Sequence, residues 1–153
     1  MPAYFLDSSA VLKRYVAETG TDWVESLFHP QGTNQISVAS ICGVEVVAAI
    51  SRKSRGGGLP VPDASRILRA FRSDFRRDFD VIELESTLIE VAMDLAERHG
   101  LRGYDAVQLA AALAVASTAR TIGVSITFVS SDRELNAAAL AEALAVDDPN
   151  DHP

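Results

Sequence analysis

The 153-residue sequence contains one cysteine, Cys42, and only two lysines, Lys13 and Lys53. A single cysteine excludes an internal disulfide, and because Cys42 sits in an apolar segment we expect it to be a small core residue. No apolar run approaches the roughly 18–20 residues of a membrane span. The first residues lack a charged stretch followed by an apolar one, which argues against a signal peptide. We therefore predict a cytoplasmic protein without a membrane segment.

Positive charge is also scarce, and it is unevenly distributed. The net charge of −7 argues against nucleic-acid binding over the whole surface. Eight of the 14 basic residues nevertheless fall between Arg52 and Arg77, against two acids. The stretch is interpreted as a solvated helix face, or as a local site for phosphate groups or an acidic partner. The candidate binding residues are Arg52, Lys53, Arg66, Arg69, Arg72 and Arg76.

The chain has the length and the hydrophobic content, 48%, of one globular domain. We place that domain at 1–148 and a frayed polar tail at 149–153. Apolar periodicity and turn residues predict alternating strands and helices. The strands are expected at 3–6, 35–38, 79–84, 126–129 and near 146. The helices are expected at 8–16, through about 28, at 40–53, from 63, at 87–99, at 104–116 and through 140. This alternation predicts an α/β sandwich around a mainly parallel central sheet.

Four acids stand out by their positions. Asp7 and Asp132 follow predicted strands, whose carboxyl ends form the usual ligand-binding edge of such sheets. Glu45 and Asp105 are each the only charge in an apolar helical segment, where an unpaired carboxylate is costly. A shared divalent cation would neutralise all four, and carboxylate oxygens favour Mg²⁺ or Mn²⁺ over Zn²⁺.

Each acid also has a simpler explanation when it is taken alone. Asp7 and Asp132 each precede a predicted helix and could serve as its N-cap. Asp105 lies in a first helical turn, where the helix dipole favours a negative charge. Glu45 is the hardest to explain in this way, because it is expected in the middle of a helix among valines.

Four segments of the chain resemble the PIN-domain ribonucleases and, within them, the VapC-type toxins of toxin–antitoxin pairs. Residues 4–15, with Asp7, are similar to the first motif of that family, and 44–46 to its helical glutamate. Residues 104–110 resemble its Tyr-Asp-Ala segment, and 128–132 its Thr-x-Asp segment. The sequence departs from the family at Ser130, where threonine is common, and at Gln108, where many members have histidine.

The resemblance implies a PIN-like α/β/α sandwich and a Mg²⁺- or Mn²⁺-dependent endoribonuclease that forms homodimers and is inhibited by a small antitoxin. Asp7, Glu45 and Asp105 are then the expected catalytic metal ligands, with Asp132 as a further ligand or a water-orienting base. Ser8 and Ser130 would orient ligands or contact phosphate, or would simply cap a helix or turn.

Other functions fit the residues less well. A metal-free ribonuclease typically uses paired histidines, and none of His29, His99 and His152 belongs to the four acidic segments. A haloacid-dehalogenase-type phosphatase would need a second Asp at Ser9, and a phosphoacceptor receiver would need a lysine after Lys53. An RNA-processing PIN nuclease outside a toxin pair, or a non-catalytic RNA- or partner-binding PIN module, remains an alternative.

Overall fold

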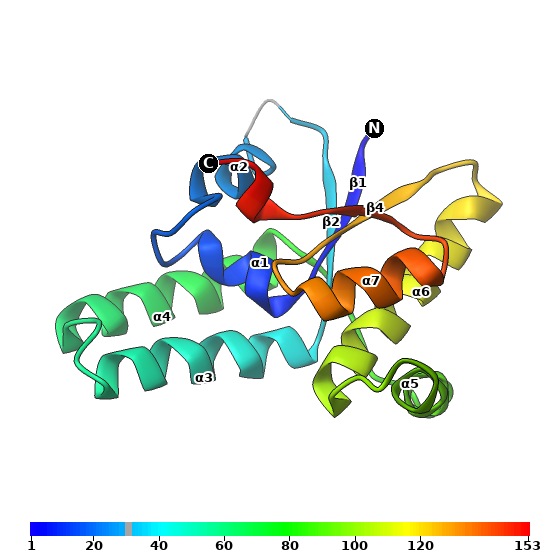
Figure 1. The fold of residues 1–153 in the computed structure, drawn as a ribbon. Helices are drawn as coiled ribbons and strands as arrows, with labels where there is room; N and C mark the ends of the chain where they lie inside the picture. The colour runs from blue at the N-terminus through cyan, green and yellow to red at the C-terminus, as the bar shows by residue number, and fades with distance from the viewer. Residues whose placement is uncertain (30–31) are drawn as a thin grey trace.

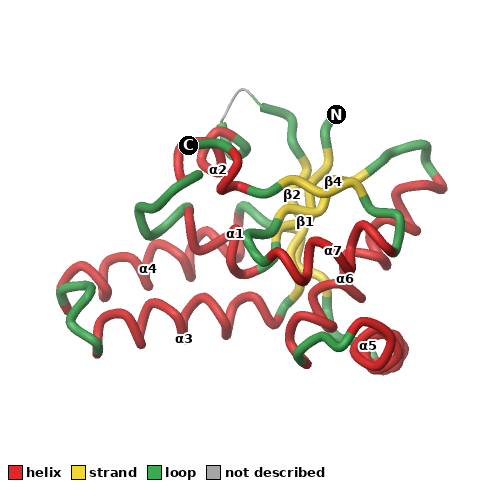
Figure 2. The backbone as a smooth tube through the Cα atoms, viewed as in Figure 1, coloured by secondary structure: helices red, strands yellow, loops and turns green. Residues whose placement is uncertain are grey.

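A five-stranded sheet forms the centre of the computed structural model, which describes residues 1–29 and 32–153. All neighbouring strands are parallel, in the order β3-β2-β1-β4-β5. Figure 2 shows β1, β2 and β4 in the middle of the molecule, with helices around them. The strands are β1 (Ala3–Leu6), β2 (Gln35–Ala39), β3 (Asp80–Ile82), β4 (Ile126–Val129) and β5 (Ala145–Asp147). The α/β sandwich predicted from the sequence is confirmed, and the sheet is entirely parallel.

Helices cover both faces of the sheet, so its strands are apolar on both sides (Figure 1). One layer contains α1 (Ser8–Lys13), α2 (Thr21–Ser26), α3 (Ile41–Arg55) and α4 (Val61–Arg77). The other contains α5 (Ser86–His99), α6 (Gly103–Thr121) and α7 (Arg133–Ala141). In β1, Phe5 enters the core under α5–α7 and Leu6 enters the core under α1–α4. Phe128 and Val129 divide in the same way in β4, which fixes the register of the two strands.

Several helix ends differ from the predicted ones. The helix expected from 63 begins at Val61, after Pro60, and Asp63 lies in its first turn. The predicted start at Thr87 is replaced by Ser86, with Glu85 as an N-cap that makes no side-chain capping bond. Proline at the start of α4 explains the first difference, since its fixed φ suits the first helical turn. Helix α1 is shorter than expected and α6 longer.

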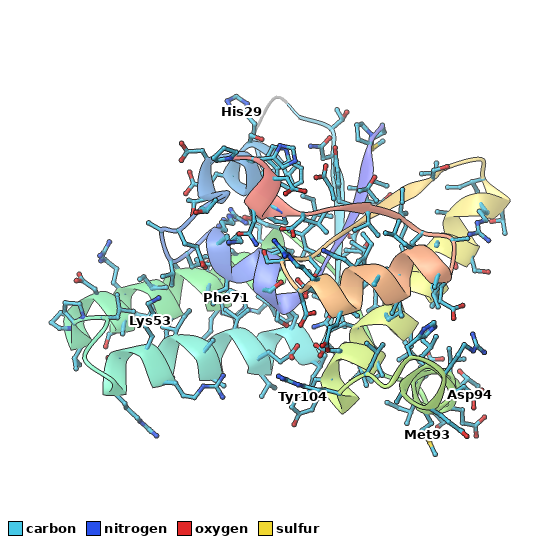
Figure 3. The ribbon with its side chains drawn as sticks, viewed as in Figure 1. His29, Lys53, Phe71, Met93, Asp94 and Tyr104 are labelled. Carbon is cyan, nitrogen blue, oxygen red and sulfur yellow. The ribbon has the colours of Figure 1, made fainter. Side chains whose placement is uncertain are left out.

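The α3–α4 hairpin projects from the sheet and places the basic stretch on its surface (Figure 1). Its inner side is held by Phe71, which is 1% exposed and packs edge-on to Tyr15. Phe75 packs so closely on α3 that a Cβ at Gly43 would lie 3.2 Å from its ring. Lys53, labelled in Figure 3, is exposed in the last turn of α3.

The last residues are ordered, contrary to the frayed tail expected from their polar composition. They form a 3₁₀ turn, η1 (Pro149–Asp151), and the ring of His152 stacks on Trp23 at 4.2 Å between centroids. Lys13, only 3% exposed, donates to Asn150 Oδ1 at 3.0 Å. Gly20, with φ of 86°, lets the chain pass directly beneath Pro149. No helix within 1–29 and 32–153 is both long and apolar enough to cross a bilayer.

Candidate active site

Asp7 lies at the carboxyl end of the central strand and is almost completely buried, at 4% exposure. Its Oδ1 accepts from Ser9 Oγ at 2.7 Å and from the backbone N–H of Ala10 at 3.0 Å, so it is the N-cap of α1. Its pKa is raised from 3.8 to about 6, mainly by burial and in smaller part by the negative charge of Glu45. The hydrogen bonds oppose this shift without cancelling it.

Ser130 connects Asp7 to Asp132. Because β1 and β4 are neighbours with Leu6 opposite Val129, the residues that follow them meet at the same edge of the sheet. The fully buried Ser130 Oγ donates to Asp7 Oδ2 at 2.7 Å and accepts from the backbone N–H of Asp132 at 3.0 Å. Asp132 Oδ1 accepts from Leu135 N at 3.0 Å, so Asp132 is the N-cap of α7.

Glu45 enters the site from the second turn of α3. Its Oε2 accepts hydrogen bonds from Ser8 Oγ and from Gln108 Nε2, the latter at 2.6 Å. Gln108 Nε2 also donates to Ser8 Oγ at 2.8 Å. Three elements, α1, α3 and α6, therefore meet at this carboxylate.

Asp105 lies in the first turn of α6, half-buried, directly after the exposed Tyr104 (Figure 3). Burial raises its pKa, and the negative charges of Asp132 and Glu45 raise it further. Arg102, one turn before it, partly opposes this rise. The capping and dipole roles considered from the sequence thus exist, but the four acids also act on one another electrostatically.

These carboxylates suit a hard divalent cation by their chemistry and by their mutual repulsion. Burial and like charges disfavour the ionised forms of Asp7 and Asp105, and a cation would relieve both effects. In the described part of the chain, no three Asp, Glu, His or Cys side chains converge tightly enough to form a metal-binding group by themselves. Mg²⁺ typically takes only one or two protein carboxylates and keeps several waters, so a looser arrangement also fits it.

His99 and His152 pair with acids outside this site, and Cys42 lies beside Ser8 as a buried thiol. His99 pairs with Glu142 and His152 with Asp147, each at 2.7 Å. Cys42 is fully buried, and burial raises the pKa of its thiol to about 12, as expected of a core residue. These environments agree with the sequence-based preference for a carboxylate site.

The sequence matches a known protein family over most of its length. The PIN domain model matches residues 4–141. The chain belongs to the PIN-domain family. Two relatives from Mycobacterium tuberculosis, Ribonuclease VapC45 (strain CDC 1551 / Oshkosh) and Ribonuclease VapC49 (strain ATCC 25618 / H37Rv), are each 32% identical over 124 residues. The match covers 81% of this chain and 84% of each relative, so this PIN domain is of the VapC type.

Solved structures share the fold of this PIN domain. PAE2754 from Pyrobaculum aerophilum has a TM-score of 0.63 at 22% identity, over 98% of this chain and 92% of its own. VapBC2 from Rickettsia felis, crystallised with a DNA fragment from its promoter, also has a TM-score of 0.63, at 16% identity. That match covers 95% of this chain and 98% of the other. At these identities the likeness concerns the fold alone.

Sequence analysis missed two side chains that organise the PIN-domain site. Ser9 donates to Asp7 and accepts from the backbone N–H of Ser131 at 2.9 Å, which links the ends of β1 and β4. Gln108 was noted only as a departure from the family pattern. Its polarity on an otherwise apolar helix, three residues after Asp105, was a usable signal. The arginines named from the sequence are all exposed on the hairpin, with Arg66 paired to Asp63 at 3.0 Å. Arg72 and Arg76 line a pocket together with Gly43 and Val44 at the start of α3.

Proposed function

We propose that this PIN domain is a divalent-metal-dependent endoribonuclease and the toxin of a toxin–antitoxin pair. The observation that carries the proposal is the buried Asp7 at the carboxyl edge of the sheet, whose pKa is raised by burial and by the negative charge of Glu45. Asp105 responds in the same way to Asp132 and Glu45. The names of the relatives, ribonucleases of the VapC type, support the activity.

In this proposal Asp7, Glu45 and Asp105 hold Mg²⁺ or Mn²⁺, and Asp132 acts as a further ligand or orients water. When bound there, the cation would polarise the phosphodiester and lower the pKa of a coordinated water. Ser9 and Ser130 keep the Asp7 carboxylate in one orientation through bonds of 2.7 Å. Ser8 orients Glu45 in the same way. Such fixed ligands lose little freedom when the substrate arrives.

The basic surface of the hairpin is proposed to bind the RNA backbone. Arg52, Lys53, Arg69, Arg72 and Arg76 are exposed and make no ion pair among the described residues. Arg66 belongs to the same surface, although Asp63 partly neutralises it. The stretch from Arg52 to Arg77 has a net charge of +6 in a protein of net charge −7. Phosphate contacts need only such a local patch.

The antitoxin partner is proposed by analogy with the solved relatives. The matching structures include VapBC2 and a toxin–antitoxin complex from Klebsiella pneumoniae, the latter with a TM-score of 0.60 at 14% identity. Homodimerisation and a cytoplasmic location belong to the same proposal. Co-purification with the product of an adjacent small gene, and growth arrest that this product relieves, would support the toxin assignment. An RNA-processing nuclease would cause no arrest of this kind.

The central experiment measures RNA cleavage by the purified chain, freed of any partner. We expect cleavage of labelled structured RNA with Mg²⁺ or Mn²⁺, and its loss on addition of EDTA. Asp7→Asn and Asp105→Asn should each abolish it while the circular dichroism spectrum stays unchanged. Cleavage that persists in EDTA, or that survives both substitutions, would overturn the proposal.

A further inference from the structure

Gln108 is buried at 1% exposure, yet its side-chain amide nitrogen contacts two polar groups of the site. Its Nε2 donates to Glu45 Oε2 at 2.6 Å and to Ser8 Oγ at 2.8 Å. Ser8 Oγ itself donates to the same Glu45 oxygen. Gln108 Nε2, Ser8 Oγ and Glu45 Oε2 are thus all within hydrogen-bond distance of one another.

The direction of the amide follows from its neighbours. Ser8 donates its single hydroxyl proton to a carboxylate oxygen of Glu45, so the serine oxygen faces Gln108 as an acceptor. The NH₂ group of Gln108 must therefore point toward both. Both donors reach Oε2. Among the described residues no donor reaches Glu45 Oε1, so this oxygen is available to another group.

A purely structural role does not explain this amide. Gln108 Oε1 is buried and has no hydrogen-bond partner among the described residues. An unpaired buried polar atom is destabilising, and an apolar side chain of the same length would fill the space without that cost. The amide is therefore best explained by what its NH₂ group does for Glu45.

We propose that Gln108 is a positioning residue: it ties Glu45 through Oε2 and presents Oε1 to the catalytic cation. This inference rests on the proposed metal site and adds a determinant of cation affinity outside the four acids. Groups that orient a metal ligand typically change metal affinity or activity by about 10–100-fold when they are removed.

The test compares Gln108→Met, which keeps the length and removes the amide, with the wild type. Mn²⁺ binding to the whole chain without RNA is measured by titration calorimetry and by electron paramagnetic resonance. We expect a roughly tenfold weaker Mn²⁺ affinity. The melting temperature without metal should stay within about 2–4 °C of the wild type. In cleavage assays kcat should fall while KM for RNA stays unchanged, because the substitution leaves the exposed hairpin arginines that are proposed to bind RNA intact.

Two further variants separate the outcomes. Gln35→Met makes the same chemical change at an exposed glutamine that bonds Asp80, and it should leave Mn²⁺ affinity unchanged. In a Glu45→Gln background, Gln108→Met should change Mn²⁺ affinity by less than about twofold, since coupled residues lose their effect once the partner is altered. An equal loss in both backgrounds, or a Gln108→Met affinity within twofold of the wild type, would overturn the positioning role. If the wild type binds no Mn²⁺, or Asp7→Asn binds it equally well, the metal site itself is wrong and the inference falls with it.

Discussion

Ser130 Oγ lies 2.7 Å from Asp7 Oδ2, although 123 positions separate the two residues in the chain. The contact exists because β1 and β4 are parallel neighbours whose last residues, Leu6 and Val129, are paired. The same hydroxyl accepts from the backbone N–H of Asp132. One buried serine thus joins two of the four acids at the point between β1 and β4 where the order of the strands along the sheet reverses.

Ser130→Ala should therefore weaken both stability and catalysis. Removing a donor to a buried charged group typically costs about 1–3 kcal/mol, and we expect a loss of that order in urea unfolding. The pKa of Asp7 should rise further, because one of the bonds that lowers it is gone. The acid limb of the cleavage–pH profile should then move to higher pH.

Ser131→Ala is the matched control for this variant. The Ser131 hydroxyl is buried and has no partner among the described residues, so its removal should leave stability unchanged or slightly higher. Equal destabilisation by the two substitutions would mean that the Ser130 hydroxyl does not support Asp7.

Asp7→Asn should raise the stability of the metal-free protein near neutral pH while it abolishes cleavage. The pKa of Asp7 is raised from 3.8 to about 6, so between these values the folded state binds the proton more tightly than the unfolded state. Stability therefore falls as pH rises through this window, and the loss persists above it. The full difference corresponds to about 3 kcal/mol. Asparagine avoids the buried charge and should recover about 1–2 kcal/mol of it.

Urea unfolding of both proteins at several pH values, without divalent cations, checks this prediction. The advantage of the asparagine variant should be largest above about pH 7 and should shrink as the pH falls through about 6 toward 3.8, because wild-type Asp7 becomes protonated in the folded state over this window. Added Mn²⁺ should stabilise only the wild type. A variant that is less stable than the wild type at neutral pH would show that the carboxylate is not under electrostatic strain.

Much of this molecule is predictable because the decisive signals are local. Asp7 and Asp132 follow short apolar strands, and Glu45 and Asp105 are isolated charges in apolar helices, so their elements follow from neighbours in sequence. The contacts made by Ser9 and Gln108 depend on which faces α1, α3 and α6 turn toward one another. Packing decides those faces, and a single sequence does not record it.

The C-terminal residues show how a local signal can mislead a prediction. Their polar composition suggested fraying, but Lys13 and Trp23, far away in sequence, provide partners for Asn150 and His152. Polarity indicates a solvated segment only when no buried donor elsewhere needs an acceptor, and Lys13 is such a donor.

Lys13→Met should accordingly destabilise the protein by about 1–3 kcal/mol, since it leaves the Thr19 carbonyl and Asn150 without their donor. Amide hydrogen exchange in η1 should accelerate more than exchange in α6. The exposed Lys53→Met, at the only other lysine, should change stability by no more than about 0.5 kcal/mol. Unchanged exchange in η1 would show that Lys13 does not hold the C-terminal turn in place.

Arg69→Gln/Arg76→Gln should weaken RNA binding without altering the chemical step. RNA affinity is measured in an Asp105→Asn background between about 50 and 200 mM salt. Two lost phosphate contacts should lower the slope of log affinity against log salt by about 1.4, at about 0.7 for each contact to a single strand. Restored to the active background, the double variant should show a higher KM for RNA and an unchanged kcat at saturation.

Arg98→Gln/Arg120→Gln removes the same charge from α5 and α6, away from the hairpin. It distinguishes an effect of the local basic patch on RNA affinity from an effect of the net charge. It should shift RNA affinity much less, because exposed charges farther apart than about 8–10 Å are largely screened at these salt concentrations. Equal effects of the two double variants would mean that RNA responds to the overall charge only. If the hairpin variant binds RNA normally but loses affinity for an antitoxin, the basic surface is a protein interface. Because the rest of this chain of net charge −7 offers no comparable basic stretch, the RNA phosphates would then be contacted by residues next to the four acids.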